Sequence, residues 1–253
     1  MDFGLEGKGV LVTGASGNIG RATAVAFGAE GARVGVAYHR RRAEAKDTAK
    51  AVVKAGGRAT LIALDLADPA QVGTAVAEFE RDLGGIDVLV NNAVMWPARG
   101  VPGELFESVP LERLWASVEA NLVGPYALTQ AAVASMRARG WGRIVHVSTG
   151  LVEDGFPGSS PYTTPKAALH GLTRTMSREL APAGILTNLV MGGYVPQGEV
   201  PPAVLEQASL SAATGRPTEA WEVANLIVFL CSAANGHITG EAIRADGHFL
   251  ART

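Results

Sequence analysis

Near its start the chain reads Gly9-Val-Leu-Val-Thr-Gly-Ala-Ser-Gly-Asn-Ile-Gly20, a short apolar run that leads into three closely spaced glycines. Gly14 permits a tight turn, Gly17 lets the backbone approach a pyrophosphate, and Gly20 allows a helix to pack closely on a strand. Three clustered glycines alone also occur in ordinary turns. Their place after an expected strand and before an amphipathic helix favours a nucleotide-binding turn.

Outward from this stretch, short apolar runs alternate with longer amphipathic segments. The runs, typical of strands buried on both faces, are 9–12, 33–38, 60–64, 86–90, 143–148, 185–190 and 242–245. The segments between them predict helices at 19–28, 42–55, 69–83, 111–139, 162–181 and 218–233. This rhythm predicts an α/β fold, a Rossmann-like doubly wound sheet of about seven parallel strands with helices on both faces.

The composition fits one domain over residues 1–253, with 47% apolar and 18% charged residues. A formal charge of −2 shows no bias toward nucleic acid or an anionic membrane surface. The single cysteine, Cys231, excludes an intramolecular disulfide and a multi-thiolate zinc site, and we expect no metal. No stretch approaches the roughly 18 apolar residues of a membrane span, so we expect a cytoplasmic location and no membrane partner.

Residues 191–216 form the one long stretch with an irregular pattern, rich in glycine and proline. Too few residues follow it to build a second core. Because long loops in compact α/β domains tend to be functional, we interpret this stretch as a lid over the substrate.

The segment after the second expected strand, Tyr38-His-Arg-Arg-Arg42, contains no acid. An NAD site usually has an acid here for the ribose hydroxyls, whereas a cation suits the 2′-phosphate of NADP. A solvated charge run is the alternative, but three cations at a helix start oppose its dipole unless an anion binds. NADP(H) is therefore favoured over NAD(H), with Arg40 as the phosphate contact and His39 beside it.

Two further strand ends carry polar groups. Asp65, in Leu64-Asp-Leu66, has a carboxylate that can accept from an adenine amino group or equally cap the following turn. Asn91-Asn-Ala93 follows the fourth strand, where amide side chains can hold the loop that passes the cofactor. Ligands bind outside the carboxyl ends of such strands, so these groups are expected at one edge.

The stretch from Ser148 to Lys166 carries groups for proton transfer. The strand 143–148 ends on Ser148, and Tyr162-Thr-Thr-Pro-Lys166 opens a helix after a loop. Residues four apart share a helix face, so the phenol of Tyr162 and the ammonium of Lys166 are expected close together. Pro165 is acceptable if the helix begins near Pro161 and position 165 falls among the unpaired first-turn amides. Together, the hydroxyl of Ser148, the phenol of Tyr162 and the ammonium of Lys166 can donate a proton to a carbonyl oxygen while a hydride arrives.

In this order, the glycine turn, Asn91-Asn-Ala93, Asn121, Ser148 and Tyr162-x-x-x-Lys166 resemble the motifs of the short-chain dehydrogenase/reductase family. The resemblance covers nearly the whole chain and is greatest to 3-oxoacyl-[acyl-carrier-protein] reductases and related ketoreductases. Tyr-x-x-x-Lys alone is a weak signal, but its ordered occurrence with four further motifs is specific.

The resemblance implies roles for these residues. Tyr162 would donate a proton to the carbonyl oxygen, and Lys166 would lower the pKa of that phenol and bind the nicotinamide ribose. Ser148 would hydrogen-bond the substrate oxygen; Thr149 is an alternative, but strand alternation and the family pattern prefer Ser148. Asn121 would hold a water in a proton relay to Lys166, although in itself it equally indicates a helix irregularity.

Cofactor contacts are expected from residues at the carboxyl ends of the strands: Gly14, Ser16, Gly17, Asn18, Ile19, Gly20, His39, Arg40, Asp65, Leu66, Asn92, Ala93, Tyr162, Lys166, Gly192 and Val195. Substrate contacts are expected from Met95, Trp96, Leu151, Phe156 and Tyr194. For the three aromatic residues among them, general packing is an equal alternative. His146 is expected to be a buried structural histidine.

The family resemblance therefore implies an NADPH-dependent carbonyl reductase acting on a small-molecule ketone such as a 3-oxoacyl thioester or a polyketide. An NAD-linked secondary-alcohol dehydrogenase is one alternative, and a nucleotide-binding homologue without turnover is another. By the same analogy the chain is expected to form a homotetramer, or a homodimer, through the helices at 111–139 and 162–181 and the C-terminal strand.

Overall fold

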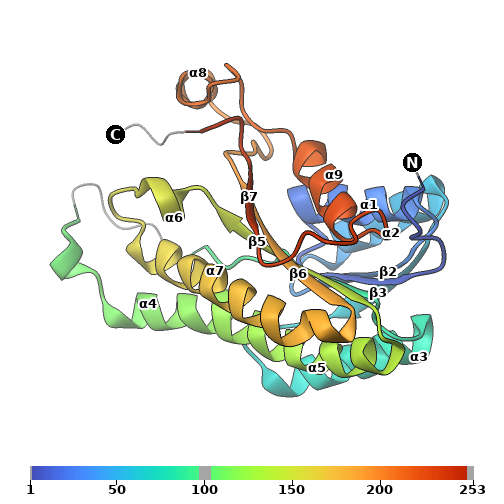
Figure 1. The fold of residues 1–253 in the computed structure, drawn as a ribbon. Helices are drawn as coiled ribbons and strands as arrows, with labels where there is room; N and C mark the ends of the chain where they lie inside the picture. The colour runs from blue at the N-terminus through green and yellow to red at the C-terminus, as the bar shows by residue number, and fades with distance from the viewer. Residues whose placement is uncertain (1, 97–103, 250–253) are drawn as a thin grey trace.

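A computed structural model describes residues 2–96 and 104–249. Within them seven parallel strands form one sheet in the order β3-β2-β1-β4-β5-β6-β7 (Figure 1). The strands are β1 (Gly9–Val12), β2 (Arg33–Tyr38), β3 (Arg58–Ala63), β4 (Val88–Asn91), β5 (Gly142–Thr149), β6 (Ile185–Gly192) and β7 (Ala242–Ala245). The strand order reverses between β1 and β4, which confirms the predicted Rossmann-like sheet and puts its switch point beside the glycine turn.

Helices cover both faces of the sheet. The layer made by α1 (Asn18–Ala29), α2 (Arg42–Ala55) and α9 (Ala220–Leu230) packs on one face. The layer made by α3 (Pro69–Leu83), α5 (Gly124–Arg139) and α7 (Ser160–Leu180) packs on the other. Shorter elements complete the chain: η1 (Phe106–Ser108), α4 (Leu111–Val118), η2 (Glu119–Val123), α6 (Leu151–Asp154), η3 (Ala181–Ala183) and α8 (Pro202–Ser211).

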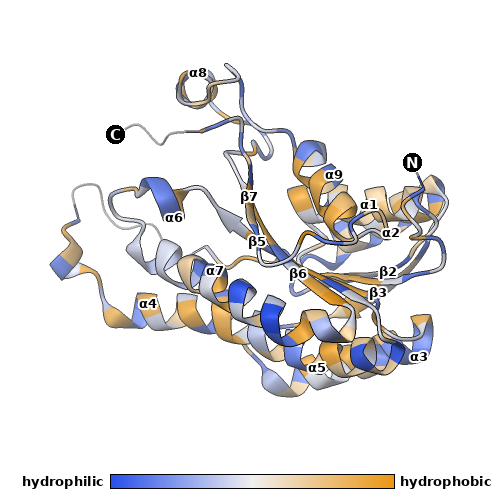
Figure 2. Ribbon diagram, in the orientation of Figure 1, coloured by the Kyte–Doolittle hydropathy of each residue, from blue (hydrophilic) through white to orange (hydrophobic). Residues whose placement is uncertain are grey.

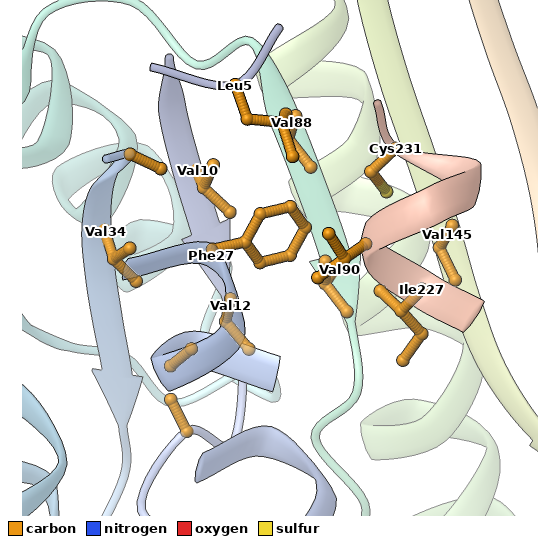
Figure 3. Packing of buried hydrophobic residues seen from close by; sticks show 14 of the residues in the cluster. Leu5, Val10, Val12, Phe27, Val34, Val88, Val90, Val145, Ile227 and Cys231 are labelled. Carbon is orange, nitrogen blue, oxygen red and sulfur yellow. The ribbon is translucent and has the colours of Figure 1, made fainter. Parts of the chain in front are cut away.

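Successive strand side chains face opposite helical layers. Val10 and Val12 lie in the cluster that contains Phe27 of α1 and Ile227 of α9 (Figure 3). Leu11, between them, belongs to the cluster of α3 and α5 on the other face. This burial of both faces explains the near-continuous apolar runs, and the strands are coloured largely hydrophobic in Figure 2.

Several helix ends follow from local sequence signals. Asp68 caps α3 by accepting from the amide of Ala70 at 2.9 Å, and Pro69 occupies its first turn. Gly56 and Gly140 end α2 and α5 with φ angles of 117° and 63°, in the region that favours glycine.

The single helix expected over 111–139 is interrupted. Between α4 and α5, the segment η2 is π-helical and contains Asn121. Pro125 has no amide to donate to the carbonyl of Asn121 four residues earlier, which accounts for the break in the α-helical ladder. The reading of Asn121 as a helix irregularity is therefore correct, and the prediction of one unbroken helix is wrong.

The expected place of Pro165 in its helix is also wrong. Helix α7 begins at Ser160, and the amide of Thr163 already donates to the carbonyl of Ser159 at 2.8 Å. Pro165 therefore lies in the second turn, beyond the unpaired first-turn amides. The carbonyl of Pro161 loses its helical donor in consequence.

The stretch 191–216 is more regular than expected. Strand β6 runs to Gly192, and α8 forms inside the stretch with Pro202 in its first turn. Figure 1 shows α8 standing away from the sheet. Among the described residues, no helix combines the length and apolar character needed to cross a membrane.

Candidate active site

The turn after β1 leaves the start of α1 open to a ligand. Gly14 has a φ of 64°, and a Cβ there would lie 2.9 Å from the Cα of Ala93. A Cβ on Gly20 would overlap the carbonyl oxygen of Gly14. Helix α1 has no side-chain cap and no acid in its first turn. Its amides and dipole thus fit the pyrophosphate of a dinucleotide.

The end of β4 is fastened to this turn. Thr13 Oγ1 accepts from the amides of Asn92 at 3.0 Å and Ala93 at 2.9 Å. The side-chain amide of Asn92 donates to the carbonyl of Thr13 at 2.8 Å. Asn92 and Ala93 therefore lie against the glycine turn, as their expected role requires. Leu66, by contrast, packs against Gly124, where an added Cβ would overlap its carbonyl oxygen.

The glycine turn also contacts the segment after β6. Asn18 Nδ2 donates to the carbonyls of Pro196 at 2.9 Å and Val195 at 3.4 Å. Gly192 faces Ile19, whose Cδ1 would lie 3.7 Å from a Cβ on that glycine. The structure thus brings together four of the predicted cofactor contacts, which are Asn18, Ile19, Gly192 and Val195. The half-buried Ser16 lies in the same turn.

The basic segment after β2 places a different arginine on the turn from the one expected. Arg41 Nη2 would lie 2.7 Å from a Cβ on Gly17, whereas the side chain of Arg40 is exposed. His39 Nε2 lies 3.3 Å from Asp65 Oδ2. Asp65 Oδ1 accepts a hydrogen bond from the amide of Ala67, in the turn that follows, at 3.0 Å. This geometry matches the turn-capping alternative for Asp65.

Tyr162 and Lys166 lie one turn apart on the buried side of α7. The side chain of Lys166 donates from Nζ to the carbonyl of Val147 at 2.8 Å, and burial lowers the pKa of this amine to about 8. Burial also raises the pKa of the Tyr162 phenol. The effect of burial on this pKa therefore outweighs the lowering that we expected from the charge of Lys166. The phenol is therefore firmly protonated at neutral pH.

Asn121 fixes the loop that follows β4. Its side-chain oxygen accepts from the amide of Met95 at 2.9 Å, and its Nδ2 donates to the Met95 carbonyl at 2.8 Å. Nδ2 also donates to Ser117 Oγ at 3.0 Å. The side-chain amide is thus used to hold Met95, and the implied relay to Lys166 stays a prediction.

The two hydroxyls at the end of β5 have different surroundings. Ser148 is buried, with Oγ 3.2 Å from His170 Nε2 and 3.4 Å from the carbonyl oxygen of Lys166. Thr149 is half-buried, and its Oγ1 accepts from the amide of Leu151 at 3.3 Å. The Ser148 hydroxyl is therefore engaged with α7, and the Thr149 hydroxyl keeps its own proton to donate.

Trp96 is the aromatic residue that contacts Tyr162. The two rings stack with centroids 4.4 Å apart and planes inclined by 28°, and 66% of Trp96 is exposed. Phe156 is also exposed and lies in the loop before α7, while Leu151 opens α6. Tyr194 follows β6, where its carbonyl accepts from Thr218 at 3.0 Å. Of the predicted substrate residues, Trp96 alone has a described ring contact with Tyr162.

His146 is buried as expected, but only one of its ring nitrogens has a described partner. Nδ1 lies 3.2 Å from the side-chain nitrogen of Asn91, and Nε2 has no hydrogen-bond partner among the described residues. Burial, with a smaller effect from the Lys166 charge, lowers the pKa of His146 to about 4. This histidine is therefore neutral at pH 7.

A family model described as Enoyl-(Acyl carrier protein) reductase matches residues 14–249. The 3-oxoacyl-[acyl-carrier-protein] reductase FabG of Aquifex aeolicus is 34% identical, covering 98% of this chain and 99% of its own. The chain belongs to the short-chain dehydrogenase/reductase family. The acetoacetyl-CoA reductase of Shinella zoogloeoides is 33% identical, with 94% and 96% covered.

A solved structure of this family has a closely similar fold. It is the promiscuous reductase LugOII, which catalyses keto-reduction at C1 during lugdunomycin biosynthesis. It is 36% identical, covers 98% of this chain and 99% of its own, and has a TM-score of 0.89. The family resemblance seen in the motifs is therefore confirmed, and the protein is an oxidoreductase.

Two contacts of the site were not expected from sequence. His170 follows Lys166 by four residues, so the helix-face argument that paired Tyr162 with Lys166 also applies to it. Arg41 was within the recognised basic segment, but an irregular residue before a helix has no periodicity that assigns a direction to its side chain.

Proposed function

We propose that this protein is an NADP(H)-dependent ketone reductase. The observation that supports this most is the shared face of α7 on which Tyr162 and Lys166 lie, since it joins a proton donor to a cation beside β5. The glycine turn at the same edge of the sheet fits a dinucleotide. The similar proteins named above as reductases agree with the reductive direction.

The chain's own residues supply the proton side of the reaction. A bound reduced nicotinamide supplies the hydride, with its two electrons, to the carbonyl carbon. Tyr162 gives its phenolic proton to the carbonyl oxygen, so that the ketone becomes a secondary alcohol. The raised pKa of Tyr162 keeps this proton in place until negative charge develops on that oxygen. Lys166, charged below about pH 8, stabilises the phenolate that remains.

We assign the hydroxyl that meets the substrate oxygen to Thr149 in place of Ser148. Thr149 is the last residue of β5 and is only half-buried, whereas Ser148 is buried. The Ser148 hydroxyl lies against His170 and α7, whereas that of Thr149 retains a free proton. A hydrogen bond from Thr149 stabilises the negative charge that develops on the carbonyl oxygen.

Asn121 acts on this site by position. Its two hydrogen bonds to Met95 fix the backbone next to Trp96, and Pro125 has no amide to donate to the Asn121 carbonyl. We propose that this carbonyl, rather than the side chain, is the group available to a water on the way to Lys166.

The preference for NADP(H) is assigned to Arg41. Its guanidinium lies against Gly17, and the segment after β2 contains no acid to bind both ribose hydroxyls. A guanidinium forms charge-assisted hydrogen bonds with phosphate, so it favours the 2′-phosphorylated cofactor. Arg40 and His39 remain candidates for further contacts with this 2′-phosphate, on the side of the adenosine.

A second copy of the chain is proposed as the partner of the α4–α5 surface. Large apolar side chains along this helix pair are about half exposed or more: Leu111, Trp115, Val123 and Tyr126. Exposed apolar groups gathered in this way are typical of an interface. A homotetramer or a homodimer would cover these side chains.

The cytoplasmic location stays a prediction of the sequence.

The test is the loss of NADPH absorbance with a panel of free ketones and 3-oxoacyl thioesters, repeated with NADH. We expect turnover with NADPH, a higher KM for NADH, and a loss of roughly 10²-fold or more in Tyr162→Phe. Tighter binding of NAD than of NADP would overturn the cofactor assignment. Unchanged turnover in Tyr162→Phe would overturn the mechanism.

A further inference from the structure

The surface next to the reacting phenol is an exposed indole. Trp96 stacks on one face of Tyr162 at 4.4 Å and leaves two thirds of its own surface exposed. Its neighbour Met95 is held at both its amide and its carbonyl by Asn121. The indole of Trp96 therefore follows a backbone residue that is held by hydrogen bonds, and it presents a large apolar face next to the Tyr162 phenol.

A carbonyl that accepts from Tyr162 must place its substituents within reach of this indole, because the two rings are already in contact. A planar ring conjugated to the carbonyl lies in the carbonyl plane and can stack on an aromatic face. A flexible acyl chain gains less from such a face, since it loses rotational freedom on binding. Phe156 is 46% exposed and lies in the loop that leads into α7, the helix that carries Tyr162.

Three arginines, on β7, before α9 and on α4, are already paired with carboxylates. Arg244 of β7 contacts the carboxylates of Asp154 at 2.9 Å and Asp246 at 2.7 Å. Arg216, before α9, pairs with Glu222 through both guanidinium nitrogens. Together they border a cavity of about 430 Å³ in which their charge is already neutralised.

Arg113 of α4 is likewise paired, with Glu104 at 2.6 Å. A phosphopantetheine or coenzyme A group that used one of these three arginines would have to displace its carboxylate, at the cost of the ion pair. Neutral substrates meet no such cost.

We propose that the natural ketone is an uncharged aryl or fused-ring ketone whose ring stacks on Trp96, rather than a thioester on a phosphate-bearing carrier. This inference rests on the proposed ketone reduction and adds the class of substrate. The reaction is unchanged: hydride to the carbonyl carbon and the Tyr162 proton to its oxygen give the secondary alcohol. Trp96 contributes to binding of the ring and takes no part in proton transfer.

Three probe ketones test planarity and charge. They are 1-tetralone, with a planar aryl ring beside the carbonyl; 1-decalone, its saturated counterpart of the same skeleton; and acetoacetyl-CoA, a phosphate-bearing thioester. We expect the highest kcat/KM with NADPH for 1-tetralone and the lowest for acetoacetyl-CoA. The opposite order would overturn the inference and leave ketone reduction intact.

Variants at position 96 test the stacking directly. Trp96→Leu should lower kcat/KM for 1-tetralone about 3- to 10-fold through KM, the range that an aromatic pair is worth. Trp96→Phe should restore most of it, and 1-decalone should be nearly unaffected. Trp221→Leu, at another exposed tryptophan on the far layer of the sheet, is the matched control. An equal loss for all three probes in Trp96→Leu would contradict the inference.

A binding measurement keeps this test separate from turnover. Equilibrium dialysis of 1-tetralone against the protein alone should give a dissociation constant that Trp96→Leu raises and Trp221→Leu does not. If the protein reduces no ketone but shows this difference, the ring site stands and the proposed reductase function fails. If it reduces ketones but 1-tetralone binding does not depend on Trp96, the ring site fails.

Discussion

His170 Nε2 lies 3.2 Å from Ser148 Oγ, one helical turn beyond Lys166 on the same face of α7. The contact joins the end of β5 to the helix that carries the proposed proton donor. The preceding carbonyl on β5, that of Val147, accepts from Lys166 Nζ. Ser148 thus belongs to the scaffold that holds Lys166 in place.

This relationship predicts opposite results for two neighbouring substitutions. Thr149→Val should lower kcat for ketone reduction by about 10²-fold, because it removes a hydrogen-bond donor to the developing negative charge. Ser148→Ala should change kcat little and lower the free energy of unfolding by about 1 kcal/mol. Steady-state kinetics and urea unfolding of both variants check this. A large loss of kcat confined to Ser148→Ala would return the role to Ser148.

Arg41→Ala should weaken the binding of NADPH and leave the binding of NADH unchanged. A hydrogen bond to a charged group contributes about 1.5–3 kcal/mol, so KM for NADPH should rise roughly 10-fold or more. Arg40→Ala is the matched control and should have the smaller effect. A larger loss in Arg40→Ala would restore the assignment made from sequence.

Ketone reduction should lose rate as the pH rises past about 8. Lys166 has a pKa lowered to about 8 by burial, so it is charged below that pH and neutral above it. The neutral amine no longer stabilises the Tyr162 phenolate, and kcat/KM should fall accordingly. The pH profile of kcat/KM for the free enzyme measures this. A profile that stays level through this range would contradict the role given to Lys166.

Stability should fall in mild acid because of His146. Its pKa is lowered from 6.5 to about 4, so between these values the unfolded chain binds more protons than the folded one. The free energy of unfolding should therefore decrease as the pH falls from 6.5 toward 4, by roughly 3 kcal/mol in all. Urea unfolding across this range measures the loss.

His146→Leu should remove most of that pH dependence. His237→Leu, at an exposed histidine, should leave it unchanged. Equal slopes in the wild-type protein and His146→Leu would show that other groups govern stability in acid.

The strands and most helices could be predicted because their signals are local. Helices α2 and α3 have the bounds read from the sequence, since the glycine and the Asp-Pro pair that end or begin them act through adjacent backbone. Strands β2 and β7 were likewise bounded by the length of their apolar runs. These parts of the fold need no distant contact to be recognised.

What could not be predicted depends on contacts between distant residues. The direction of Ser148 is set by His170, 22 residues later, and that of Arg41 by the turn at Gly17. Helix α8 was missed because prolines and glycines around it have the composition of a loop. The break at Asn121, by contrast, was readable from Pro125, since the lost amide acts only four residues away.

The hydrogen bond from Asn18 to Pro196 joins the glycine turn to the segment after β6. It ties the glycine turn to the stretch that carries α8, so a nucleotide that binds the turn more tightly with this hydrogen bond in place would also favour that position of the stretch. Such linkage is reciprocal: whatever affinity the nucleotide gains from a settled α8 segment, that segment gains in equal measure from the nucleotide. We therefore expect nucleotide binding at the turn and the position of the α8 segment to be coupled through Asn18, with the same free energy in both directions.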